Sequence, residues 1–144
     1  MSALARVERQ AEVGRGRDEL FELVATPAGL RRWLDDAEME AVVGSAVRLR
    51  LRDAIAIGTV LAIAAPQHIS LSWDWEGEPL GTPSVVAFDL VDHGQRTHLT
   101  LRHVGLPYGQ LPVHEALWSY WFGRLVAAAD RPGEAAPVVG DNAG

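Results

Sequence analysis

The sequence predicts an α+β fold in which an antiparallel β-sheet wraps around a long C-terminal helix, with two short helices after the first strand. Three observations predict it. The 144 residues, 48% hydrophobic and 22% charged, have the length and composition of one globular domain. Several successive segments alternate apolar and polar residues, as strands with one buried face do. One long apolar segment near the C-terminus has helical spacing and can cover such a sheet.

The N-terminal part is expected to contain one strand and two short helices. Residues 5–13 alternate loosely, and glycines at 14 and 16 follow them as a turn. A helical run then begins at Asp18. Thr26 and Pro27 predict the start of the second helix, because Thr is a good N-cap and Pro suits the first helical position.

Antiparallel strands are expected to fill the middle of the chain. The alternation is clearest where Val47, Leu49 and Leu51 face one way and arginines face the other. A loop with two glycines and two prolines interrupts the series at residues 76–83, and residues 92–95 form a hairpin turn. The expected strands are residues 38–43, 46–52, 55–64, 68–75, 84–91 and 96–104.

The longest helix is expected from about residue 112 to about residue 129. Its apolar residues recur at helical spacing: Leu117, Trp118, Trp121, Phe122, Leu125 and Val126. Residues 1–130 are therefore expected to form one domain. Residues 131–144 contain Pro and Gly without periodicity and are expected to be a flexible tail.

Composition excludes several classes of function. Cysteine is absent, which excludes disulfides, thiolate metal sites and cysteine nucleophiles. All 13 basic residues are arginine, so Schiff-base chemistry and a phosphate-binding P-loop lysine are excluded as well. A net charge of −6 disfavours nucleic acid as a partner. No apolar run approaches the length of a membrane span, and the N-terminus lacks the apolar core of a signal peptide, so a cytoplasmic location is expected.

The motifs of metal and nucleotide sites are incomplete. His98 and His103 lie five residues apart on one strand and therefore point to opposite faces. His114 and Glu115 begin a helix as in zinc proteases, but Trp118 occupies the position of the second histidine. Glu19 replaces the third glycine of a dinucleotide-binding loop. We expect neither a metal nor a cofactor.

Five motif-like features, in this order and spacing, resemble a known superfamily. They are ATPAGLRRW at 25–33, the glycines at 44 and 58, PQHISLSW at 66–73, TxLTLxHxG at 97–105, and Trp118 with Phe122 and Leu125. Over about residues 5–129, the chain is similar to the helix-grip proteins of the START-like, Bet v 1-like (SRPBCC) superfamily. More closely, it resembles the bacterial single-domain relatives of the activator of heat-shock protein 90 ATPase.

The resemblance implies an incomplete barrel with a cavity between the sheet and the last helix, which relatives use for lipids, polyketides and aromatic compounds. The implied function is binding of a small hydrophobic or aromatic molecule, without defined catalysis. The alternative for these side chains is ordinary core packing. The residues expected to line the cavity are Trp73, Trp75, Phe88, Leu101, His103, Trp118, Trp121 and Phe122.

His103 shares the apolar face of its strand with Leu99 and Leu101. Two interpretations are open. In the first, the imidazole is a polar anchor or an acid–base group at the cavity wall. In the second, it is a core histidine bonded to the backbone or to a neighbouring tryptophan.

Two other functions remain open beside binding. The first is a cofactor-independent cyclase, dehydratase or hydrolase, in which His103 polarises a carbonyl with Tyr120 or Asp74 as a helper. The second is a stress-response or co-chaperone partner. A homodimer is also an expectation, because the sheet edges and apolar loop residues such as Leu106 and Leu111 need cover.

Overall fold

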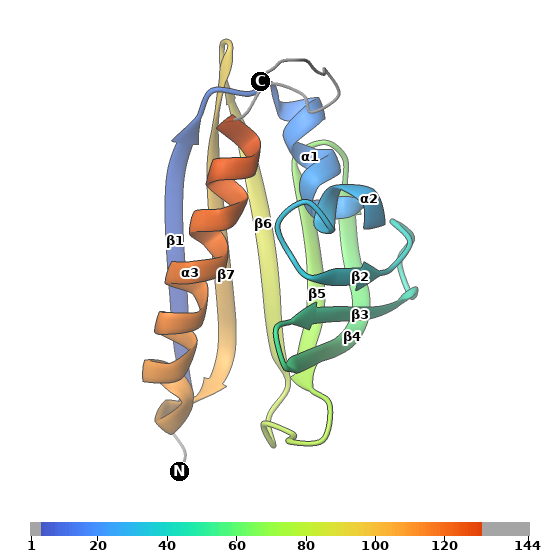
Figure 1. Ribbon diagram of the computed structural model, residues 1–144, viewed down its shortest axis with the longest axis vertical. Helices are drawn as coiled ribbons and strands as arrows, with labels where there is room; N and C mark the ends of the chain where they lie inside the picture. Colours follow the sequence, from blue (N-terminus) through green and yellow to red (C-terminus); the bar gives the residue numbers. More distant parts are fainter. Residues whose placement is uncertain (1–3, 131–144) are drawn as a thin grey trace.

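The computed structural model describes residues 4–130, so the expected tail at 131–144 lies outside the described residues (Figure 1). No helix in this part of the chain is long and apolar enough to cross a membrane. The elements in chain order are β1 (Leu4–Val13), α1 (Arg17–Ala25), α2 (Pro27–Leu30), β2 (Asp36–Glu38), β3 (Ala46–Leu51), β4 (Ala54–Ala64), β5 (His68–Trp75), β6 (Ser84–His93), β7 (Arg96–Pro107), the short 3₁₀ helix η1 (Tyr108–Gln110) and α3 (Leu111–Asp130).

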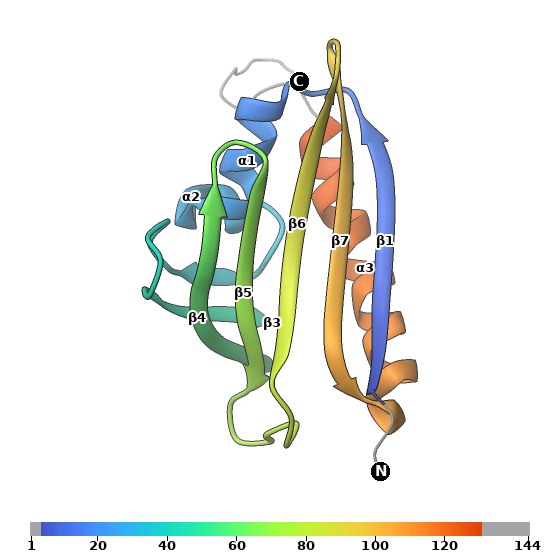
Figure 2. The same ribbon diagram turned by 180° about the vertical axis from the view of Figure 1, so that it is seen from behind.

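The seven strands form an antiparallel sheet, as the expected fold class requires, and their order is β1-β7-β6-β5-β4-β3-β2. The first strand therefore pairs with the last. One face of the sheet is covered by helices: α3 lies along β1 and β7, and α1 and α2 lie over the other half (Figure 1). Among residues 4–130, no helix lies on the opposite face (Figure 2).

The core lies between the sheet and the helices, where the alternation of the strands places their apolar side chains. Val47, Leu49 and Leu51 of β3 are buried and the residues between them are exposed. The helix α3 contributes a buried face of Trp118, Trp121, Phe122 and Leu125, which agrees with its spacing in the sequence.

The junction of α1 and α2 forms as its sequence predicts. Thr26 caps α2: its Oγ1 accepts a hydrogen bond from the N–H of Gly29 at 3.0 Å and donates to the carbonyl of Glu22 at 2.8 Å. A Cβ at Gly29 would lie 1.9 Å from that same carbonyl oxygen, so only glycine fits. The indole of Trp33 is buried behind this junction and donates to the carbonyl of Leu23 at 2.7 Å.

Two local expectations are wrong. The strand expected at 38–43 is β2 at Asp36–Glu38, because the chain turns after it and leaves Val42 and Val43 exposed. Gly44 completes this turn with φ of +91°, a conformation that favours glycine. Leu106 is not an exposed loop residue, because β7 continues to Pro107 and buries its side chain completely.

Candidate functional site

The structure places seven of the eight expected cavity residues in the packed core. These seven are at most 6% exposed: Trp73, Phe88, Leu101, His103, Trp118, Trp121 and Phe122. The eighth, Trp75, is partly exposed at the end of β5. Aromatic side chains therefore occupy the space between the sheet and α3, and the accessible part of the site lies beside Trp75.

Four of the expected residues meet in one aromatic cluster around Trp73. The ring of Trp73 lies 5.4 Å from that of Trp75, 5.4 Å from that of Trp118 and 5.5 Å from that of His103. The cluster joins β5, β7 and α3, and edge-on packing of its rings is favourable. Phe88 lies outside the cluster and packs against Trp33, with ring centroids 6.1 Å apart.

Both ring nitrogens of His103 are occupied by protein groups. The indole Nε1–H of Trp118 donates to Nδ1 of His103 at 3.1 Å. Nε2 then carries the proton and donates to Oγ of Ser84 at 3.0 Å, and that hydroxyl donates to the carbonyl of Trp73. Burial lowers the pKa of His103 to about 3, helped by the nearby His114. This geometry favours the core-histidine interpretation, because no ring position is open to a substrate.

His114 belongs to the same cluster, although sequence reasoning treated it only as part of an incomplete metal motif. It is 1% exposed in the first turns of α3, and its ring lies 5.3 Å from that of His103. Its Nδ1–H donates to the carbonyl of Gln110 at 2.8 Å, and its Nε2 accepts from the indole of Trp75 at 3.0 Å. Burial lowers its pKa as well. Helical spacing could have identified it, because it precedes Trp118 by four residues.

A groove opens beside this pair, where the start of α3 meets the loop between β5 and β6. Its volume is about 460 Å³. Most of its wall is apolar, and polar groups lie at Glu78, Gln110 and His114. The lining residues are Ala54, Trp75, Glu78, Pro79, Leu80, Gln110, Val113, His114 and Leu117. Of the residues expected from the sequence, only Trp75 lines this groove.

Asp74 holds one wall of the groove in place. Its Oδ1 accepts hydrogen bonds from the backbone N–H of Trp75 at 2.8 Å and of Leu80 at 2.7 Å. The carboxylate is therefore used in the loop after β5, where it stabilises a turn. Its contacts give Asp74 a positioning role for the groove.

Tyr120, the other expected helper, lies apart from the groove on the exposed side of α3. The Arg52 guanidinium lies 4.8 Å from the centre of its ring, and Arg124 lies 6.0 Å away. The hydrogen bond from Arg52 lowers the pKa of the phenol. These contacts attach the turn between β3 and β4 to α3.

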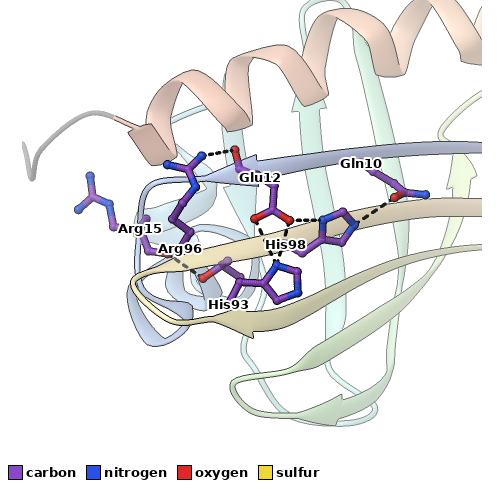
Figure 3. A network of polar contacts seen from close by, with 7 residues as sticks. Gln10, Glu12, Arg15, His93, Arg96 and His98 are labelled. Atoms are coloured by element: carbon purple, nitrogen blue, oxygen red, sulfur yellow. Dashed lines mark hydrogen bonds and ion pairs between the residues drawn. The ribbon is translucent and has the colours of Figure 1, made fainter.

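A second polar network lies on the open face of the sheet (Figure 3). Oε2 of Glu12 contacts Nδ1 of His98 at 2.7 Å and Nδ1 of His93 at 3.1 Å, and Nε2 of His98 contacts Oε1 of Gln10 at 3.0 Å. The hydrogen bond with His98 is the main reason that the pKa of Glu12 is lowered. Within residues 4–130, no group of three or more His, Asp or Glu side chains is arranged to hold a metal ion.

An antiparallel sheet that grips a long C-terminal helix defines a helix-grip protein, and the family model that matches this chain places it in the START-like, Bet v 1-like (SRPBCC) superfamily. The chain belongs to the family described as Activator of Hsp90 ATPase homolog 1-like protein, whose sequence profile matches residues 16–130. No curated protein sequence matches the chain.

Solved structures with the same fold include CalU16 from Micromonospora echinospora, at 21% identity and a TM-score of 0.71, with 90% of this chain and 85% of that chain covered. The Aha1 dimer from Colwellia psychrerythraea is 17% identical with a TM-score of 0.72, covering 88% and 96%. DynU16, a protein of the dynemicin biosynthetic locus, is 21% identical with a TM-score of 0.71; the match covers 85% of this chain and 46% of that one.

Proposed function

We propose that this protein binds a small apolar or aromatic molecule in the groove beside Trp75, without a defined reaction. The observation that carries the proposal is the groove itself. It is an apolar hollow at one end of the packed region between the sheet and α3. Its wall comes from β4, β5, the loop after β5, η1 and α3, so the binding unit is the whole domain at residues 1–130.

The size and chemistry of the groove suit a ligand of two or three fused rings. Its volume of about 460 Å³ falls within the range of about 300–1,000 Å³ typical of small-molecule sites. Trp75, Leu80, Val113 and Leu117 supply apolar surface to its wall. Glu78 and Gln110 add polar groups that can orient the ligand.

The comparisons support this proposal at the level of the superfamily. One of the structures with the same fold, DynU16, comes from a biosynthetic locus, which is compatible with a natural-product ligand. The Aha1 relative described as a dimer is compatible with a homodimer here. A cytoplasmic location is part of the proposal.

The groove is tested with Val113→Asp and a matched control, Val42→Asp. The two valines are exposed to the same degree, 57% and 58%, but only Val113 lines the groove. We expect Val113→Asp to weaken binding of a naphthalene probe at least tenfold, because a carboxylate is poorly solvated beside bound hydrocarbon. Val42→Asp should bind like the wild type. Titration calorimetry measures both.

Native mass spectrometry of freshly purified protein complements the titration. We expect a mass excess that disappears on denaturation, and its value would give the class of the ligand. Equal affinity of the two aspartate variants for the probe would contradict the proposed site. Loss of binding in Val42→Asp alone would contradict it as well.

A further inference from the structure

The indole N–H of Trp73 is buried without an acceptor. Trp73 is 3% exposed. Among the described residues, its Nε1 is the one buried side-chain nitrogen or oxygen atom that has no hydrogen-bond partner. Three other tryptophans all donate: Trp33 to the carbonyl of Leu23, Trp75 to His114 and Trp118 to His103. The sequence therefore supplies acceptors for indoles elsewhere in this core.

An unsatisfied donor at this position is energetically unfavourable. A buried N–H without an acceptor has lost the hydrogen bond that it makes with water in the unfolded chain. A phenylalanine would pack against the same rings without this cost. A buried donor without an acceptor in a folded protein needs an explanation. One explanation is that a bound molecule supplies the acceptor.

The position of Trp73 connects this donor to the groove. The ring of Trp75 lines the groove, and the ring of Trp73 packs edge-on against it at 5.4 Å. Trp75 is only partly buried, and its indole N–H makes one hydrogen bond, to His114. Trp73 does not itself line the groove, so a molecule bound there reaches its N–H only if Trp75 changes position.

We propose that the ligand is an uncharged aromatic molecule with a carbonyl-type oxygen, and that the indole N–H of Trp73 donates a hydrogen bond to this oxygen once Trp75 has moved aside. This inference rests on the proposed function and adds the polar group by which the ligand is recognised. A neutral acceptor fits the site better than an anion. Among the lining residues the charged group is the carboxylate of Glu78, and no arginine is present to pair with an anion.

The test uses two probes of nearly the same shape. Acetylnaphthalene carries a carbonyl oxygen, and isopropenylnaphthalene has a CH₂ group in its place. In wild-type protein we expect the ketone to bind about tenfold more tightly, the effect of one hydrogen bond made by an otherwise unpaired buried donor. Trp73→Phe should remove this preference, so that the variant binds the two probes with equal affinity.

Proton–nitrogen correlation spectra of isotope-labelled wild-type protein give a readout that needs no variant to fold. We expect the indole signal of Trp73 to move downfield with the ketone and not with the hydrocarbon, as a new hydrogen bond forms. The indole signal of Trp33, which is bonded to Leu23 away from the groove, is the internal control and should stay in place.

The two hypotheses fail in different ways. If both probes bind equally well and the Trp73 signal responds equally to both, the acceptor inference is overturned and the groove remains a binding site. If neither probe binds, the proposed function is overturned together with it.

Discussion

At the scale of single residues, the aromatic cluster contains two histidines held in their neutral form. His103 accepts from Trp118 and donates to Ser84, and His114 accepts from Trp75 and donates to Gln110. Each ring thus has one defined tautomer, because one partner is an N–H donor and the other an oxygen acceptor. A proton added to either ring would face an indole N–H, so the cluster as built excludes the imidazolium.

This arrangement predicts a loss of stability in acid. The pKa of His103 is lowered to about 3, below its usual value of about 6.5 in unfolded chains, so the unfolded state takes up a proton first as pH falls. The contribution of His103 to the free energy of unfolding is fully present above about pH 6.5. Below that pH the contribution decreases by at most about 1.4 kcal/mol per pH unit. Urea unfolding of wild type and His103→Gln between pH 7 and pH 4 measures the difference.

Glutamine is the matched replacement, because its amide oxygen can accept from Trp118 and its amide nitrogen can donate to Ser84 without titrating. We expect the variant to lose less stability than wild type over this interval. Parallel pH profiles for the two proteins would show that His103 titrates alike in the folded and unfolded states.

At the scale of elements, β4 and β5 approach each other unusually closely at Gly58. A Cβ placed there would lie 1.8 Å from the backbone oxygen of Ser72, so no other residue fits unless the strands separate. The Oγ of Ser72 also accepts from the N–H of Thr59 at 2.8 Å. This contact holds the strand that carries Trp73 and Trp75, and so helps to position the groove wall.

Two glycine-to-alanine changes should therefore have opposite signs. Gly58→Ala is expected to lower the free energy of unfolding by about 1–3 kcal/mol, the usual range for overpacking. Gly123 lies within α3 with nothing within 4 Å of its would-be Cβ. Gly123→Ala should raise the free energy of unfolding by up to about 1 kcal/mol, because alanine favours helix. Equal changes of one sign in urea unfolding would contradict this explanation.

At the scale of the whole molecule, the antiparallel strands and the long helix followed from local patterns, because alternation and helical spacing report burial directly. Thr26 and Pro27 likewise marked the second helix correctly. The open part of the site could not be predicted this way. Whether tryptophans line or fill a gap depends on rotamers and long-range contacts, and the pairing of His114 with Trp75 joins positions that are distant in sequence.

The domain boundary gives a prediction for the whole molecule. Gly14 donates its backbone N–H to the side chain of Asp130 at 3.0 Å, which ties the end of α3 to the end of β1. We expect a protein of residues 1–130 to unfold at the same temperature as the full chain and to bind the naphthalene probe with the same affinity. A lower midpoint, measured by circular dichroism, would place part of the stabilising structure beyond residue 130.

The pairing of β1 with β7 also bears on how the chain reaches this structure. Val7 lies opposite His103, so the five strands from β2 to β6 are made before the first strand can pair with β7. Contacts between such distant positions slow folding, because a long loop has to close first. During synthesis on the ribosome, β1 is therefore made before the other strands and stays unpaired until β7 has been made.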